Sequence, residues 1–482
     1  MERGASGRAG ILDFYRVLWS EAAVTARRVR LDRWVEILLV VAWVALRIAD
    51  VGRLPMAGWA AVVVLVALAA PRSGFVVLAA IAPFPEGLLF TRDVGLKPVL
   101  ALVLLAAVGL RVVVDRRSRV WPGWSLVLAG GVILGTGVGL LVSAQRFGIA
   151  FALDAFELWF QGPFTAVAAL AVAYWVSRDG GLGPLVALLG SATVAGVLSL
   201  VDYQFPTLLR NSPLDWVLQG PYVAGRLTGV IRSWVSTAAL VMVPATVYLA
   251  LATLGRGILV RAGSLLLAVP LLATAYFTYN RAVFLGLFAL AVVVAWRIRR
   301  AFGVVVLVVG LVGGALSLPY YLQLRAEAVG GSGAVQPGAP IVASDLARLN
   351  AWATSWRMFL DSPLIGHGYR SYRQVAPAFG DTTLNAPHSE WFRLFAENGL
   401  VVGLLGLGFA AATAVALARR RDALGTGLLG AWLSFVLAAS FNNPFLFNAV
   451  TIVAFGVAGV GLAHARLGPS ERPPGVEAGR DG

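Results

Sequence analysis

Residues 382–418 read TTLNAPHSEWFRLFAENGLVVGLLGLGFAAATAVALA, and this stretch carries the pattern that decides the fold. Its second part, residues 399–418, has no charged side chain and is long enough, at about 1.5 Å per helical residue, to cross a hydrocarbon layer about 30 Å thick. Its first part places His388 and Glu390 only a few positions ahead of that apolar run. We therefore expect a membrane-spanning helix that directly follows a polar segment.

Apolar runs of the same kind recur along most of the chain. The 482 residues are 59% hydrophobic and only 13% charged, unlike those of a soluble globular protein. We expect an all-α polytopic membrane protein with about 12–14 transmembrane helices. The candidate spans are residues 34–50, 57–71, 74–90, 96–114, 124–143, 160–177, 183–203, 234–254, 258–279, 281–297, 301–319, 399–418, 425–441 and 445–465.

The arginines predict how these helices are oriented. The formal net charge is +15, but the basic residues form short clusters between apolar runs instead of one soluble face, which argues against nucleic acid as a partner. With both termini in the cytoplasm, clusters such as DRRSR, RIRR and ARRRD fall on the inside, as the positive-inside rule requires. The same layout places three long segments outside, residues 144–159, 204–233 and 320–398.

Five regions follow from this layout. Residues 1–33 are basic and partly amphipathic, lack the apolar core of a cleavable signal peptide, and are expected to lie on the cytoplasmic membrane surface. Residues 34–319 hold most of the spans, 320–398 form a large external loop containing short helices, 399–466 hold the last spans, and 467–482 are expected to be a disordered cytoplasmic tail.

The scarcity of metal-binding residue types narrows the possible chemistry. The chain has no cysteine, so disulfides, thiol nucleophiles and cysteine metal sites are excluded. Three histidines argue against a histidine-rich metal site, and we expect neither a metal nor a cofactor.

Two helices are expected inside the large loop. The segment SDLARLNAWATSWRMFLDSP predicts a helix over residues 344–361, capped by Ser344 and ended by the proline that follows. A second helix is predicted over residues 389–398 and ended by Gly399. At helical spacing this second helix would place His388 on the face of its aromatic residues and pair Arg393 with Glu397.

Several arginines lie where the positive-inside rule does not favour them. Arg226, Arg232, Arg281, Arg348 and Arg370 all fall on the expected outer side. Arg281 abuts apolar sequence on both sides, where a charge is costly unless it has a partner or a water-filled cavity, so it is a functional candidate. The alternatives are that Arg281 extends to the interface as an ordinary flanking residue and that Arg226 is simply solvated.

His388 is the candidate for proton transfer. A histidine near its unperturbed pKa of about 6.5 can accept a proton from an attacking hydroxyl, although a purely capping or hydrogen-bonding role is the alternative. Arginines suit phosphate, and an external membrane cavity suits a phosphate attached to a lipid tail. The residues thus point to a lipid-linked pyrophosphate as the class of substrate.

Four stretches resemble one family, the bacterial O-antigen ligases and the related lipid-linked oligosaccharide polymerases, which are membrane glycosyltransferases of the GT-C kind. They lie in the order of that family and span residues 226 to about 407. The stretches are GRLTGVIRSWVSTAALVMVPATVYL, TYNRAVFLGL, RLNAWATSWRMFLDSPLIGHGYRSYR and NAPHSEWFRLFAENGLVVGLL.

The resemblance implies an activity and a place for it. A glycan carried on undecaprenyl pyrophosphate would be transferred, without a metal and with inversion, at the periplasmic face of the bacterial inner membrane. Arg226 and Arg281 would bind the pyrophosphate, His388 would assist the attack of an acceptor hydroxyl, and Glu390 would orient His388 or the acceptor. The expected partners are this lipid-linked donor, the lipid bilayer, and a glycan, glycolipid or protein acceptor.

Two questions stay open at the level of sequence. A ligase and a polymerase would use the same residues, because the acceptor is selected by the shape of the cavity. A transporter or flippase of the same lipid-linked glycan would also have arginines and many spans, but it predicts internal repeats and mid-membrane charges. A structural scaffold would leave Arg281 and His388 unexplained.

Overall fold

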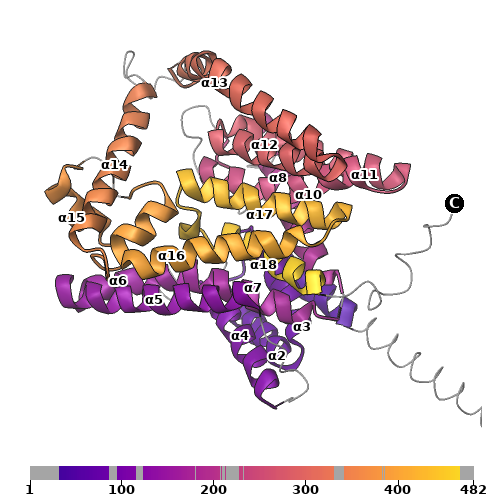
Figure 1. Ribbon diagram of the computed structural model, residues 1–482. Coiled ribbons are helices and arrows are strands. Elements are labelled where there is room, and N and C mark those ends of the chain that lie inside the picture. The colour runs from indigo at the N-terminus through magenta and orange to yellow at the C-terminus, as the bar shows by residue number, and fades with distance from the viewer. Residues whose placement is uncertain are drawn as a thin grey trace, which may run out of the picture.

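The elements of the computed structural model are helices throughout, which confirms the expected all-α fold (Figure 1). The structure describes residues 32–85, 95–114, 123–179, 181–206, 208, 212, 227–231, 233–330, 341–382, 384 and 386–466. Residues 1–31 of the N-terminal region expected at residues 1–33 lie outside the described residues, as do the tail expected at residues 467–482, Arg226 and Arg232.

Ten helices among the described residues are long and apolar enough to cross a membrane, so the chain is a polytopic membrane protein. They are α4 (Leu96–Val114), α5 (Trp124–Phe147), the continuous helix of α6 (Ile149–Trp159), η2 (Phe160–Phe164) and α7 (Thr165–Val176), α8 (Gly183–Gln204), α10 (Trp234–Leu254), α11 (Ile258–Phe277), α12 (Arg281–Ile298), α16 (Glu390–Ala418), α17 (Ala423–Phe441) and α18 (Asn448–Arg466).

The remaining expected spans overlap helices whose described apolar part is shorter. A helix covers residues 32–48, α2 (Arg53–Ala69) has 17 residues and α3 (Pro71–Ile81) has 11. In α13 (Arg300–Gly330) the described apolar part is Arg300–Leu316. The other elements are short or lie in the large loop: α14 (Ile341–Asp361), α15 (Tyr372–Val375), η4 (Ala376–Phe379) and η5 (Pro444–Leu446).

Two segments expected between spans are helical instead. Within residues 144–159, α5 continues to Phe147, the chain turns at Gly148 with a φ of 89°, and α6 begins at once. Asp154 and Glu157 break the apolar run of α6, but they do not prevent a helix from forming. Likewise α13 continues to Gly330, past the expected end of its span at residue 319.

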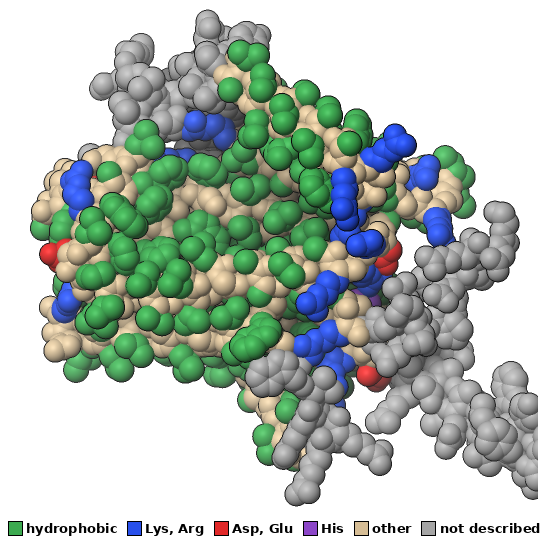
Figure 2. Space-filling view, in the orientation of Figure 1, with side chains coloured by type: hydrophobic (Ala, Val, Ile, Leu, Met, Phe, Trp, Pro, Cys, Tyr) green, Lys and Arg blue, Asp and Glu red, His purple; other side chains and the backbone are tan. Residues whose placement is uncertain are grey.

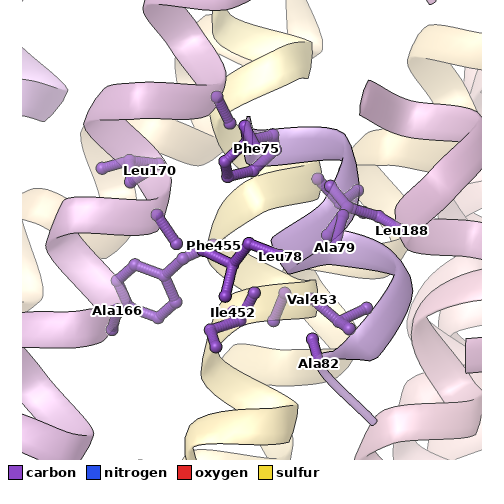
Figure 3. Close-up of a cluster of buried hydrophobic side chains, with 14 of the residues drawn as sticks. Phe75, Leu78, Ala79, Ala82, Ala166, Leu170, Leu188, Ile452, Val453 and Phe455 are labelled. Atoms are coloured by element: carbon purple, nitrogen blue, oxygen red, sulfur yellow. The ribbon is translucent and has the colours of Figure 1, made fainter. Parts of the chain in front are cut away.

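The core lies where α3, α7, α8 and α18 meet. Side chains from these four helices interdigitate in one buried cluster (Figure 3), among them Phe75, Leu78, Leu170, Leu188 and Phe455. A side chain at Gly459 of α18 would collide with the carbonyl oxygen of Leu170 in α7. The glycine thus allows the two backbones to approach closely, as small residues do between membrane helices.

The two ends of the helix bundle differ in charge. Lys and Arg side chains gather at one end (Figure 2), where Arg297 donates to the carbonyl of Ala418 at 2.7 Å and Arg420 pairs with Asp422. At the opposite end α14 lies across the helices, close to the start of α16 (Figure 1). The positive-inside rule predicts that the basic end faces the cytoplasm and that the α14 end faces outward.

Candidate active site

The helix that follows His388 is broken as expected. Gly399 has a φ of 79°, which separates residues 390–398 from the membrane-spanning remainder of α16. A Cβ at this position would collide with the carbonyl of Leu364, and the next residue, Leu400, donates its N–H to Pro363 at 2.7 Å. The break therefore brings the loop after α14 against the first two turns of α16, and α14 ends at Asp361 as predicted.

That loop contains the Gly-His-Gly turn at residues 366–368. Both ring nitrogens of His367 have partners, since Nε2 lies 2.9 Å from the carbonyl oxygen of Met358 and Nδ1 lies 2.9 Å from Nη1 of Arg146. Burial and the charge of Arg146 lower the pKa of His367, while the Met358 carbonyl and Asp361 raise it, and burial has the largest effect. The neutral ring is favoured and joins α14 to α5.

A buried ion pair lies at the start of α16. Glu390 accepts from Nε of Arg393 at 2.7 Å and from the backbone N–H of Phe445 at 3.2 Å. Arg393 also lies over the ring of Tyr369, at 5.4 Å from the ring centroid. Pairing two buried charges in this way avoids the large cost of leaving either alone.

The sequence predicted that Arg393 pairs with Glu397, and this prediction is wrong because the ion pair forms with Glu390. The carboxylate of Glu397 accepts the backbone N–H of Arg370 at 2.8 Å and that of Tyr372 at 3.2 Å. Because the oxygens of Glu397 hold this turn, the carboxylate that accepts from Arg393 is that of Glu390, three residues away. Glu390 is fully buried, and its carboxylate accepts from the Arg393 side chain and from the backbone N–H of Phe445.

His388 itself lies before the helix. It has a φ of 51°, and α16 begins only at Glu390 after the extended residue Ser389. The predicted sharing of a helical face by His388 and the aromatic residues is therefore wrong, because helical spacing does not apply to a residue outside the helix. The side chain is about half-buried, and burial together with the nearby positive charge of Arg348 lowers the pKa of His388.

α14 runs beside this segment. Arg348 lies near His388, and one helical turn later Trp352 stacks on Phe392, with ring centroids 5.6 Å apart and 18° between the planes. The ring of Phe441, the last residue of α17, lies 5.8 Å from Trp352. Three elements distant in the sequence thus converge next to His388.

Arg281 lies at the same end of the bundle. It begins α12, whose N-cap Asn280 accepts the N–H of Ala282 at 3.1 Å. α12 and α17 are antiparallel: Ser434 donates to the carbonyl of Gly286, and a Cβ at Gly430 would meet Leu290, one turn further along α12. Continuing this register places Arg281 beside the last turn of α17, which ends at Phe441.

Arg370 lies toward α5 and α6 instead. It has a φ of 64°, its side chain is exposed, and Nη1 lies 3.5 Å from the carbonyl oxygen of Asp154. The described residues between Arg226 and Arg232 lie against the end of α11, where Leu227 donates its N–H to Phe277 at 3.1 Å. The structure therefore brings His388 and Arg348 together, puts Arg281 at the same end, and places Arg370 on a neighbouring turn.

Two features of this end of the bundle were not foreseen. One is the set of carboxylate contacts that organises the turns, from Glu390 to Phe445 and from Glu397 to Arg370. The other is the pair Asn442 and Asn443, both buried between α17 and η5. The sequence does carry a signal for the second group, because two adjacent amides interrupt an otherwise apolar region at FNNPFLF.

Comparison with known proteins supports the resemblance of the motifs. No curated protein matches the chain. Residues 266–407 match the family model described as O-antigen ligase. The matched segment begins in α11, ends in α16, and contains Arg281, Arg348 and His388. Over residues 266–407 the chain therefore carries a domain of the O-antigen ligase family, within the O-antigen ligase and polymerase superfamily.

Proposed function

We propose that this protein is a membrane glycosyltransferase that moves a glycan from undecaprenyl pyrophosphate to an acceptor hydroxyl at the outer face of the bacterial inner membrane. Its main support is the position of His388 beside Arg348, with Arg281 at the same end of the bundle, all inside the segment that matches the O-antigen ligase family. The acceptor is a glycan, a glycolipid or a protein.

His388 acts on the acceptor. Its lowered pKa favours the neutral imidazole near neutral pH, and a neutral ring nitrogen can take the proton of the acceptor hydroxyl. As the proton leaves, the hydroxyl oxygen attacks the anomeric carbon from the face opposite the pyrophosphate. The bond between that carbon and the pyrophosphate oxygen breaks, its electron pair leaves with undecaprenyl pyrophosphate, and the anomeric configuration is inverted.

The arginines act on the leaving group. Guanidinium groups bind phosphate oxygens in a forked geometry and remain charged, so Arg281 and Arg348 neutralise the charge that develops on the pyrophosphate. Arg226 and Arg232 flank a segment that lies against the end of α11, close in sequence to Arg281, and they are proposed to contact the same group. Arg370 would contact the donor from the side of α6.

The proposal is tested by transfer in liposomes. The purified protein is reconstituted with undecaprenyl-pyrophosphate glycan extracted from the source cells, as wild type and as Arg281→Ala and His388→Ala. Arg299→Ala, an exposed arginine at the opposite end of α12, is the matched control. Release of undecaprenyl pyrophosphate by wild type and control, but not by the other two variants, is expected.

The products separate the remaining alternatives. A ladder of products indicates a polymerase, and a single shifted band indicates a ligase. Movement of the intact donor across the bilayer without release of undecaprenyl pyrophosphate would indicate that the protein is a transporter and not an enzyme. Full transfer activity in both site variants would refute the assignment of Arg281 and His388.

A further inference from the structure

Three buried polar groups, one in α14 and two at the end of α17, have no partner within the part of the chain that the structure describes. They are Nε1 of Trp352, Nδ2 of Asn442 and Oδ1 of Asn443. Asn442 is 2% exposed and Asn443 is 8% exposed, and the unpartnered amide atoms of both are buried. A buried polar group without a hydrogen bond is rare in native proteins and calls for a ligand or a water molecule.

Trp352, Phe392 and Phe441 form an aromatic surface at this end of the bundle. Trp352 stacks on Phe392, which comes four residues after His388 in the sequence, and the ring of Trp352 also lies 5.8 Å from that of Phe441. Asn442 and Asn443 follow Phe441 directly, at the end of α17. All three aromatic residues are only partly buried, so part of this aromatic surface stays exposed.

The chemistry of these groups selects one class of ligand. An indole N–H and two amides are neutral, so their hydrogen bonds to a phosphate would be weaker than those of the charged arginines at the same end of the bundle. A hydrocarbon tail would leave all three polar groups without hydrogen bonds. A pyranose ring has an apolar face of C–H groups that packs on aromatic rings and a rim of hydroxyls that both donate and accept hydrogen bonds, so it satisfies both parts of the surface.

We propose that Trp352, Asn442 and Asn443 form a carbohydrate subsite that binds a sugar next to His388 and selects it by its hydroxyl groups. The identity of this sugar, as part of the transferred glycan, rests on the proposed function. The subsite provides specificity, because a site built to bond a hydroxyl discriminates strongly against a sugar that lacks it. Neighbouring contacts hold it in place: Trp391 donates to Ser440 at 2.9 Å and the Phe445 N–H bonds to Glu390.

The first test measures binding of the free glycan, separate from transfer. The probe is the oligosaccharide released by mild acid from the lipid-linked glycan of the source cells, and its binding to the full-length protein in detergent is followed by saturation-transfer NMR. The variants are Asn442→Ala, Asn443→Ala and Trp352→Phe, the last of which keeps an aromatic ring and removes the N–H. We expect each variant to bind roughly fivefold to tenfold more weakly than wild type.

The control is another buried polar atom without a hydrogen-bond partner among the described residues, far from the proposed subsite. Oγ1 of Thr413 is also buried and unpartnered, but it lies in the second half of α16 near the basic end. Thr413→Val should bind the oligosaccharide as the wild type does. The three substituted atoms have no hydrogen-bond partner among the described residues, so Trp352→Phe loses no hydrogen bond within that part of the chain. Any fall in its midpoint of thermal unfolding should be small and come from the smaller ring that packs on Phe392 and Phe441.

The outcomes separate this subsite from the proposed reaction. Weaker binding in all three variants with wild-type binding in Thr413→Val supports the subsite, whether or not transfer is observed in liposomes. Wild-type binding in the three variants, or no binding of the oligosaccharide by the wild-type protein, overturns the subsite. The transfer activity of His388→Ala tests only the proposed function. Its outcome does not change the conclusion drawn from the binding measurements.

Discussion

The carboxylate of Glu397 accepts the backbone N–H of Arg370 at 2.8 Å, across an interval of 27 residues. The same carboxylate accepts the N–H of Tyr372, so one side chain on α16 holds the turn that follows the Gly-His-Gly sequence. Arg370 lies in the left-handed region, with a φ of 64°. A candidate substrate-binding arginine is thus held in an uncommon backbone conformation by an acid for which the sequence predicted a different partner.

Replacing Glu397 by glutamine should loosen this turn. Glutamine has one acceptor oxygen where two N–H groups need partners, so a buried donor is left without a hydrogen bond at a cost of about 1–3 kcal/mol. We expect a lower unfolding midpoint in detergent and reduced transfer activity. Asp179→Asn, an exposed acid in a turn after α7, is the control and should change neither. Unchanged stability in Glu397→Gln would contradict the structural role of the carboxylate.

Removing one member of the Glu390–Arg393 pair should destabilise the protein strongly. Both residues are buried, so Arg393→Met leaves an uncompensated carboxylate at a cost of about 3–5 kcal/mol. The double variant Glu390→Leu/Arg393→Met should recover part of that loss, because no buried charge remains. Denaturant unfolding of the single and double variants in detergent gives the coupling energy, and strictly additive effects would argue against the pair.

Activity should fall on the acid side of the pH profile as His388 becomes protonated. Burial and Arg348 lower the pKa of His388, so the neutral base persists to a pH below its ordinary value of about 6.5. Arg348→Ala removes a positive charge, which should raise the pKa and shift the acid limb of kcat/KM to higher pH. The measurement is transfer against pH for wild type and Arg348→Ala, and a shift toward lower pH would exclude this assignment.

Gly399→Ala should disrupt the break in α16. Its φ of 79° is unfavourable for alanine, and the new Cβ would collide with the carbonyl of Leu364, so we expect a loss of at least about 1–3 kcal/mol. Gly408→Ala is the matched control in the same helix, because its Cβ would make only an ordinary contact with Leu128. Alanine is the better helix former, so the control should be as stable as wild type or more stable. Thermal unfolding of both variants in detergent distinguishes them.

The predicted orientation can be tested directly because the chain has no cysteine. Thr382→Cys lies in an exposed part of the large loop, and Arg299→Cys lies at the basic end. A maleimide that cannot cross membranes should label Thr382→Cys in intact spheroplasts and label Arg299→Cys only after lysis. The reverse pattern would place the candidate site in the cytoplasm and exclude the proposed topology.

The sequence by itself determined the features that depend on local patterns. Long apolar runs predicted the helices, because only a continuous helix satisfies its backbone hydrogen bonds in a hydrocarbon layer. The break at Gly399 followed from the ability of glycine to adopt a positive φ, and the motifs around Arg281 and His388 pointed to the O-antigen ligase family that residues 266–407 match. Local patterns failed where polar residues interrupt an apolar helix, as Asp154 and Glu157 do in α6.

Only the tertiary structure decided which polar groups meet. Spacing along a helix allowed Arg393 to pair with either glutamate, and the choice of Glu390 depends on a turn that occupies Glu397. The register of α12 against α17 brings Arg281 to the end of the bundle where His388 lies. The packing of α14 places Trp352 against Phe441, the residue before the two buried asparagines. These relationships arise from contacts between distant segments, and no local pattern encodes which helices will pack together.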